Sequence, residues 1–202
     1  MKESTKALKK KIKSRLDKER YQHTLGVAYT ASCLAMRYGE DMEKAYIAGL
    51  LHDCAKCIPN EEKLKLCRKY DIELSETEKA VPSLIHAKLG AYLCGQEYGI
   101  TDPDIVGAVR THTTGAPGMS LLQKIIFAAD YIEPNRDAAP NLEEVRSLCF
   151  SDLDAGVYRI LSDTLNYLNG RKDGAVDPAT RETHDYYEEL LAGRGRDESG
   201  AS

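Results

Sequence analysis

A His-Asp pair and a Cys-x-x-Cys pair overlap in the stretch AGLLHDCAKC, at residues 48–57. The first pair is His52-Asp53, and the second is Cys54 and Cys57. Imidazole, carboxylate and thiolate groups all bind metal ions, and a Cys-x-x-Cys pair can also carry out redox chemistry. A structural zinc site needs about four ligands, whereas the other cysteines of the chain are solitary. We therefore interpret Cys54 and Cys57 as packing residues, with a cysteine-based zinc or redox protein as the alternative.

Carboxylates follow apolar runs at two places, Asp53 and Asp130. A buried carboxylate without a partner is costly, so each needs a cation or strong hydrogen-bond donors. A salt bridge or a helix cap would satisfy either acid alone, but four histidines also lie within or at the ends of predicted helices: His23, His52, His86 and His112. A shared divalent cation is the more economical hypothesis, because mixed imidazole and carboxylate ligands suit Fe, Mn, Zn, Co or Ni. Such an ion would supply a bound hydroxide and a Lewis acid for phosphate hydrolysis.

Basic residues recur at short offsets from these candidate ligands. Arg20 precedes His23 by three residues, and Lys56 follows the His-Asp pair by three, so each shares a helix face with its neighbour. Arg136 follows the second acid by a short loop, from which a guanidinium can bind phosphate oxygens. Thr113 precedes a glycine-containing turn whose hydroxyls and amides suit the same ligand. Each residue alone would be a solvated charge or a plain turn; together they predict a phosphate-binding site.

The elements that must position these side chains are predicted to be helices. Apolar residues recur at helical spacing, and no stretch alternates with a period of two over five or more residues. We therefore expect an all-α fold, a helical bundle with the metal site between its helices. Caps and breakers predict helices at about 4–38 (with a break near Gly26), 41–53, 60–70, 82–99, 103–112, 120–132, after Asn141, at 153–170 and at 178–191. We expect one domain over 1–191, with a core at about 18–135 completed by helices at 141–191, and a disordered tail at 192–202.

Composition excludes several classes of function. The formal net charge is −4, with 30% charged residues. The chain therefore lacks the excess of basic residues that a general nucleic-acid binder would have. No run of 18 apolar residues occurs, and the basic N-terminal stretch has no apolar signal core. We therefore expect a cytoplasmic protein with reduced thiols and no membrane partner. The oligomeric state stays open, with a homodimer as one alternative.

The spacing of these residues resembles that of a known superfamily. A histidine (His23), a His-Asp pair (His52-Asp53) and a later aspartate (Asp130) follow the pattern of the HD domain superfamily of metal-dependent phosphohydrolases. The runs RYQHTLGVAYTA, AGLLHDCAK, HAKLGA, THTTGAPGMSLLQKIIFAADYIEPNR and VDPAT resemble the bacterial YqeK family. The resemblance covers roughly residues 8–190, and the segment from HTTG to the final arginine is its most specific part. It implies a symmetrical diadenosine tetraphosphate hydrolase that releases two ADP.

The resemblance also implies the cofactor and the roles of individual residues. The metal is expected to be iron, as one or two ions, with Mn, Co, Ni or Zn as alternatives. Its expected ligands are His23, His52, Asp53 and Asp130. The expected catalytic residues are Asp53, Lys56, His86 and His112, where the two histidines are second-metal ligands or phosphate contacts and one of them protonates the leaving oxygen. The expected contacts to a dinucleoside polyphosphate or to ADP are Arg20, His23, Asp53, Lys56, His86, His112, Thr113, Asp130 and Arg136, with Lys172, Asp173 and Gly174 beside the base or ribose.

The chain departs from the family pattern near its C-terminus. Asp177 stands where the family tends to have histidine, and His184-Asp185 where it tends to have Arg-Asn. These changes leave the metal core intact but put base recognition near residues 171–180 in doubt, and we expect His184 to be a surface helix residue. Two alternatives remain within this interpretation. One is an HD-type hydrolase of deoxynucleotides, guanosine alarmones or cyclic dinucleotides, and the other is a non-catalytic nucleotide-sensing module.

Overall fold

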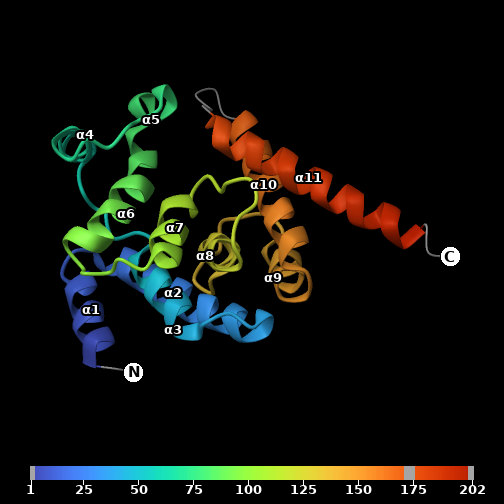
Figure 1. Ribbon diagram of the computed structural model, residues 1–202, viewed down its shortest axis with the longest axis horizontal. Coiled ribbons are helices and arrows are strands. Elements are labelled where there is room, and N and C mark those ends of the chain that lie inside the picture. The colour runs from blue at the N-terminus through green and yellow to red at the C-terminus, as the bar shows by residue number, and fades with distance from the viewer. Residues whose placement is uncertain (1–2, 171–175, 200–202) are drawn as a thin grey trace.

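The chain folds into helices only, as expected. The computed structural model describes residues 3–170 and 176–199, and these contain no strand. The helices are α1 (Glu3–Lys13), α2 (Lys18–Tyr38), α3 (Met42–Leu51), α4 (Asn60–Lys69), α5 (Glu76–Ala80), the 3-10 helix η1 (Pro82–Ile85), α6 (His86–Gln96), α7 (Pro103–Thr111), α8 (Leu121–Ile132), α9 (Leu142–Ser151), α10 (Leu153–Asn169) and α11 (Pro178–Ser199) (Figure 1). Over the same part of the chain, every helix is too short or too polar to span a membrane.

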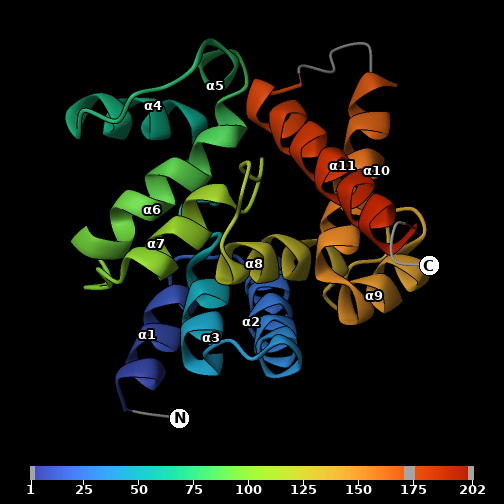
Figure 2. The same ribbon diagram turned by 45° about the vertical axis from the view of Figure 1, so that its right-hand side comes forward.

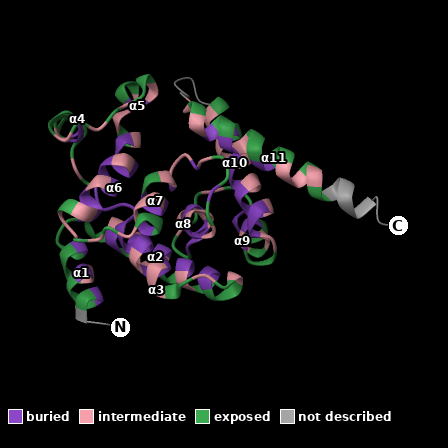
Figure 3. Ribbon diagram, in the orientation of Figure 1, coloured by how far each residue is buried: buried purple, intermediate pink, exposed green. Residues whose placement is uncertain are grey.

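Helix α8 lies at the centre of the molecule. It packs against α2, α3, α7, α9 and α10, and seven of its twelve residues are buried. Figure 3 colours the ribbon by burial, with buried residues in purple. The segment is apolar nearly all round, which is the pattern of a helix buried on every side. Its first turn is closed by a capping box, in which Ser120 and Gln123 each accept from the other's backbone amide. A carboxylate on this helix, such as that of Asp130, is therefore held in a fixed position.

Helices α2 and α3 approach each other closely. A Cβ atom added at Gly49 would lie 2.6 Å from the Cα atom of Ala28, so only glycine fits at this crossing. The close packing brings the first half of α2, with His23, to the end of α3, with His52. Figure 2 shows α4, α5 and α6 on one side of this core and α10 and α11 on the other, with the connection between α7 and α8 rising between them.

Several helix boundaries differ from the sequence prediction. The break in the first long helix falls at residues 14–17 and not near Gly26, because Asp17 accepts a hydrogen bond from the backbone amide of Arg20 at 2.8 Å and caps α2. Helix α3 ends at Leu51, so the His-Asp pair lies in a turn. The short helix α5, capped by Ser75, was not expected.

The last helix is longer than predicted. Helix α11 reaches Ser199, whereas the sequence predicts an end near residue 191 and a tail at 192–202. Arg194 explains the extension, because it pairs with Asp154 and, at 3.4 Å, with Asp152 at the start of α10. The prediction for the final residues, 200–202, lies outside the described residues.

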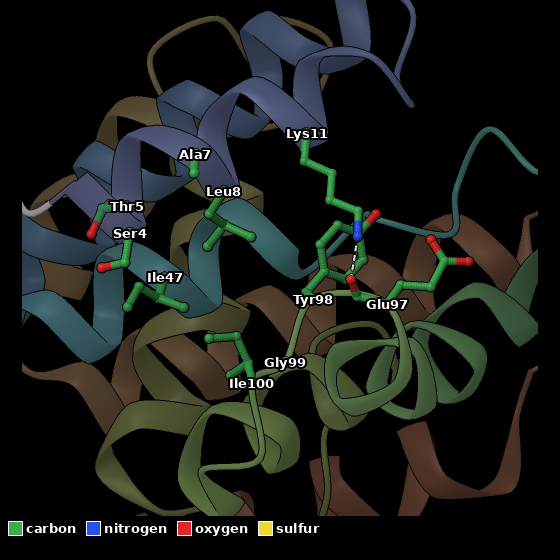
Figure 4. A pocket seen from close by; sticks show the side chains of 10 residues that line it. All are labelled: Ser4, Thr5, Ala7, Leu8, Lys11, Ile47, Glu97, Tyr98, Gly99 and Ile100. Atoms are coloured by element: carbon green, nitrogen blue, oxygen red, sulfur yellow. Dashed lines mark hydrogen bonds between the residues drawn. The ribbon is translucent and has the colours of Figure 1, made fainter.

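Helix α1 covers one edge of the core. Lys11 donates to the backbone oxygen of Glu97 and lies 5.0 Å from the ring centroid of Tyr98, and Arg15 pairs with the Glu97 carboxylate at 3.1 Å. Between α1, α3 and residues 97–100 lies a pocket of about 350 Å³, seen from close by in Figure 4. None of the predicted site residues lines it.

Candidate metal centre

The structure brings the predicted ligands together from five places in the chain. His23 lies in α2, His52 and Asp53 in the turn after α3, His86 at the first position of α6, His112 directly after α7, and Asp130 in α8. The turn forms because α3 ends early, with the amide of Cys54 donating to the carbonyl of Leu51 at 3.0 Å. All four histidines are buried or nearly so. The site is therefore built mostly from helix ends that meet around α8.

The Nδ1 atom of each histidine has a hydrogen-bond acceptor. For His52, His86 and His112 the acceptor is the carbonyl oxygen three residues earlier, at 2.7, 2.6 and 2.7 Å. For His23 it is the Oε1 atom of Glu133, at 3.1 Å. An acceptor at Nδ1 fixes the proton there and leaves the lone pair on Nε2. The rings of His52, His86 and His112 thus present an unprotonated Nε2 atom, whereas His23 also has an acceptor beside its Nε2 atom, the Oδ1 atom of Asp130.

These Nε2 atoms point at one another in two pairs. Those of His23 and His52 lie 3.3 Å apart, and those of His86 and His112 lie 3.1 Å apart. Two lone pairs cannot form a hydrogen bond with each other, and a cation between its members would satisfy each pair. The arrangement has the chemistry and the spacing that a set of metal ligands would need.

Asp53 lies between the two histidine pairs. Its Oδ2 atom is 3.4 Å from Nε2 of His52 and 3.9 Å from that of His23. Its Oδ1 atom is 3.2 Å from Nε2 of His86 and 3.7 Å from that of His112. This Oδ1 atom is buried and has no hydrogen-bond donor, which is costly unless a cation satisfies it. The single carboxylate of Asp53 therefore faces two pairs of imidazole nitrogen atoms, one pair on each of its oxygens.

Asp130 completes the group around His23. Its Oδ1 atom lies 3.0 Å from Nε2 of His23 and 3.9 Å from that of His52. Two ligand atoms that are each about 2.1 Å from an ion and at about a right angle lie about 3 Å apart. The N–N and N–O distances of 3.0 to 3.3 Å match that spacing. The residues present therefore fit a divalent ion in chemistry and in spacing.

Burial and charge act together on the ionisable groups of the site. Burial alone would raise the pKa of Asp53, but its interactions with His52, His112 and His86 lower it well below its usual value. The pKa of Asp130 is lowered in the same way, mainly by His23. Burial lowers the pKa of His86 to about 4 despite the nearby Asp53. Both acids are thus carboxylates and His86 is a neutral imidazole at neutral pH, the protonation states that bind metals.

The predicted phosphate-binding residues surround this cluster. Arg20 donates to Oδ2 of Asp53 at 2.8 Å, and Arg136 donates to Oδ1 of Asp130 at 3.0 Å. Lys56 lies 3.9 Å from Oδ1 of Asp53 and 3.2 Å from Nε2 of His86, although a turn and not a helix places it there.

Thr113 lies against the second histidine pair. Its hydroxyl is 3.2 Å from Nε2 of His86 and 3.1 Å from that of His112. The loop that follows is held by α11, because a Cβ atom at Gly115 would lie 2.7 Å from the methyl group of Thr183. Beside the first pair, a pocket of about 580 Å³ opens between α2 and residues 133–138, and its lining includes Arg20, His23 and Arg136.

Sequence reasoning missed Glu133, which holds His23. Glu133 is 1% exposed, and its Oε2 atom accepts from the backbone and side-chain amides of Asn135 at 2.8 and 3.0 Å. A Cβ atom at Gly26 would lie 2.1 Å from that oxygen, so the glycine makes room for it. Arg146 donates to the carbonyl oxygens of Ile132, Glu133 and Arg136 and fixes this segment. An acid three residues after Asp130 was a signal in the sequence, since this offset places both acids on one side of the chain.

The cysteine pair takes no part in the cluster. Cys54 is buried with Sγ directed at the carbonyl of Gly90, whereas Cys57 is exposed and donates to Asp17 at 3.3 Å, so only Cys54 is the packing residue we expected. The interaction of its thiol as donor to Cys94, with burial, raises the pKa of Cys54, and burial raises that of Cys57. Raised values disfavour the thiolate form that binds metal or reacts.

Two other sets of predicted residues lie apart. His184, on α11, contacts Asp185 at 3.1 Å, and its ring lies against Tyr158; with Glu188 it forms a largely exposed group separate from the histidine pairs. Lys172, Asp173 and Gly174, the predicted base or ribose contacts, lie outside the described residues.

Comparisons with known proteins identify the family of the chain. Residues 20–135 match the family model described as HD domain. A symmetrical bis(5'-nucleosyl)-tetraphosphatase of Bacillus subtilis is 42% identical over 175 residues, 87% of this chain and 92% of the relative. One of Halalkalibacterium halodurans is 43% identical over 182 residues, 89% and 93% of the two chains. A crystal structure from Clostridium acetobutylicum, of a predicted HD superfamily hydrolase involved in NAD metabolism, matches with a TM-score of 0.88 at 37% identity and covers 92% of this chain and 97% of that one.

Proposed function

The chain belongs to the HD domain family, and we propose that it is a metal-dependent hydrolase that cleaves diadenosine tetraphosphate symmetrically into two ADP. The convergence of four Nε2 atoms on the two oxygens of Asp53 carries this proposal. Relatives that cover nearly the whole chain have the same activity in their names. The alternatives, another nucleotide substrate or a non-catalytic sensing module, have less support for that reason.

The ligand set supports two ions that share Asp53. His23, His52, Asp130 and Oδ2 of Asp53 would hold the first, and His86, His112 and Oδ1 of Asp53 the second. The first group offers two imidazole nitrogens and two carboxylate oxygens, a mixed set that suits iron, with manganese, cobalt, nickel or zinc as alternatives. Bound there, the metal supplies a Lewis acid for a phosphoryl oxygen and a water whose pKa is lowered toward neutrality.

The remaining residues bind and orient the phosphates. Arg20 and Lys56 flank the two oxygens of Asp53, and Arg136 lies beside Asp130, so three cations face the tetraphosphate chain. The Nδ1 protons of His86 and His112 are directed at carbonyl oxygens, which favours metal ligation over proton donation for both rings. Lys56 is then the better candidate to stabilise the charge on the departing ADP, and Thr113 orients the chain through its hydroxyl.

We also propose that one domain carries the activity. The family model ends at residue 135, but α9 and α10 pack on α8, and Arg146 of α9 holds the segment that carries Glu133. Helices α9 to α11 therefore belong to the same folding unit as the site.

Product analysis tests the function directly. Protein loaded with ferrous iron without oxygen is incubated with diadenosine tetraphosphate, and the products are separated by chromatography. We expect ADP alone, and we expect Asp53→Ala to lose both turnover and bound metal. ATP with AMP, or normal turnover by Asp53→Ala, would contradict the proposal.

A further inference from the structure

The pocket between α2 and residues 133–138 adjoins the metal centre directly. Its volume is about 580 Å³, within the range of sites that hold small molecules. His23, which belongs to the first histidine pair, forms part of its wall. The 350 Å³ pocket beside α1, by contrast, is lined by none of the proposed site residues. A molecule in the larger pocket would therefore lie next to the reacting phosphates.

The inner wall of this pocket carries two arginines that also contact the metal centre. Arg20 donates to Oδ2 of Asp53 at 2.8 Å, and Arg136 donates to Oδ1 of Asp130 at 3.0 Å. The two arginine side chains are 33% and 36% exposed. The Nε atom of Arg136 has no hydrogen-bond partner among the described residues. A guanidinium has five donors, so both arginines can bind phosphate oxygens while they hold the carboxylates.

The outer wall has a different chemistry. Gln22 of α2, Glu19 and Asp137 are exposed and line the pocket. None of these three side chains forms a hydrogen bond or an ion pair with another described residue. A carboxylate repels phosphate but accepts hydrogen bonds from ribose hydroxyls, and an amide both donates and accepts, as the edge of a base requires. The outer part therefore suits a neutral nucleoside and not a further phosphate.

A symmetrical dinucleotide needs a place for each of its two nucleosides. Asp53 separates the two histidine pairs, so a phosphate chain bound across it would extend to both sides. On the second side, Thr113 lies against His86 and His112, and the loop after it contacts Thr183 of α11. On the first side lies the pocket beside His23.

We infer that this pocket binds one of the two nucleoside halves of the substrate. The inference rests on the proposed function and deepens it. Arg20 and Arg136 bind the phosphates of this half at the inner end of the pocket. Gln22 contacts the base, and Asp137 accepts from the ribose hydroxyls. The other nucleoside leaves the metal centre on the side of α11.

Replacing Gln22 tests the contact to the base. Gln22→Leu keeps most of the volume of the side chain and removes its donor and its acceptor, so KM for diadenosine tetraphosphate should rise about fivefold. The ratio of bound metal to chain should stay the same, because no hydrogen bond joins Gln22 to a proposed ligand in the described part of the chain. Gln96→Leu, exposed at the end of α6 and outside this pocket, is the matched control and should leave KM unchanged.

Replacing Asp137 distinguishes a nucleoside from a phosphate by the sign of the effect. If phosphates occupied the outer part, removal of this negative charge would tighten the binding of any polyphosphate. If a ribose occupies it, Asp137→Ala should raise KM for diadenosine tetraphosphate about threefold without weakening the binding of inorganic tripolyphosphate. A lower KM in this variant would overturn the assignment.

Binding without turnover gives a second readout on the metal-loaded full chain. One probe is diadenosine tetraphosphate with a methylene group in place of the central bridging oxygen, and the other is inorganic tripolyphosphate, which has no nucleoside. Thermal unfolding should show that Gln22→Leu loses part of the stabilisation by the first probe and keeps that by the second. Equal losses with both probes, or equal changes in Gln22→Leu and Gln96→Leu, would overturn the nucleoside pocket.

The two proposals fail in different ways. If the wild type releases no ADP from diadenosine tetraphosphate, the proposed function fails, and the methylene-bridged probe still tests the pocket. If ADP is released while Gln22→Leu and Asp137→Ala match the wild type in KM and in both thermal shifts, only the pocket assignment fails.

Discussion

Asp53 joins the two halves of the site through a single side chain. Each of its oxygens faces a different histidine pair, so the two halves should respond differently when a histidine is replaced. A ligand from one pair affects mainly its own ion, whereas the shared carboxylate affects both.

We predict that replacing a single histidine removes one of the two proposed metal ions and leaves the other bound. His112→Gln should lose the ion on the Oδ1 side and keep the ion held by His23, His52 and Asp130. Asp53→Asn should lose both. Metal analysis of purified, iron-loaded proteins measures the ratio of metal to chain. Equal metal contents in wild type and His112→Gln would show that His112 is not a ligand.

We predict that Glu133 tunes the metal affinity through His23. Glu133→Gln keeps an acceptor for Nδ1 of His23 and removes the charge, so metal affinity should fall by about tenfold. Competition with a chelator measures it without relying on turnover. Glu143→Gln, exposed in the first turn of α9, is the control. Equal metal affinities in the two variants would contradict a role of Glu133 in metal binding.

The proposed ligands of the site were visible in the sequence, but Glu133 beside them was not. The His-Asp pair and Asp130 stand out because polar groups in apolar runs need partners. Glu133 follows the end of an apolar helix and looked like an ordinary helix end, because its importance depends on Gly26, more than 100 residues away.

At the scale of elements, the long helices and several of their N-terminal caps were predicted from the sequence. Several other helix boundaries were not. Apolar periodicity identified the long helices, and Asp102, Asp41 and Ser120 cap helices near the expected positions. Gly26 was expected to break a helix, yet it lies inside α2, where its lack of a side chain leaves room for the carboxylate of Glu133. Such a position can be interpreted only when the partner segment is known.

Glycines at helix contacts give a paired prediction. Gly49→Ala would place Cβ 2.6 Å from Cα of Ala28, so it should destabilise the protein by about 2 kcal/mol through overpacking. Gly95→Ala, in α6, meets no atom nearer than 3.8 Å and should stabilise it by about 0.5 kcal/mol, because alanine favours the helix. Urea unfolding of both variants measures the signs. Destabilisation by Gly95→Ala, or none by Gly49→Ala, would contradict the packing described for these helices.

For the whole molecule, the C-terminal helix is docked by charges. Lys124 of α8 pairs with Asp154 of α10 at 2.7 Å, and Arg194 of α11 pairs with the same carboxylate. The extension of α11 could not be predicted from the glycine-rich and charged sequence after Leu191, because its anchor lies about 40 residues earlier.

This cluster should make stability depend on pH. Burial acts to raise the pKa of Asp154, but Lys124 and Arg194 lower it below the usual value. A depressed folded-state pKa adds stability above about pH 4, which is lost as the pH falls through the folded-state value. Asp154→Asn should therefore cost about 2 kcal/mol at pH 7, and the difference from wild type should shrink toward pH 3. Urea unfolding at both pH values tests this. Glu189→Gln, exposed on α11, is the control, and a difference that does not vary with pH would contradict the pairing.

Arg146 has a consequence for anyone who shortens this protein. A fragment cut where the family model ends, at residue 135, would retain each proposed metal ligand. It would lack the guanidinium that binds the carbonyl oxygens of Ile132 and Glu133, and nothing in the fragment would replace it. The carboxylate that orients His23 would then sit at a frayed chain end. A minimal catalytic unit drawn from the ligand pattern alone would thus be an inefficient metal binder, and because α10 packs on α8 and α11 packs on α10, useful fusion or truncation points lie beyond α11.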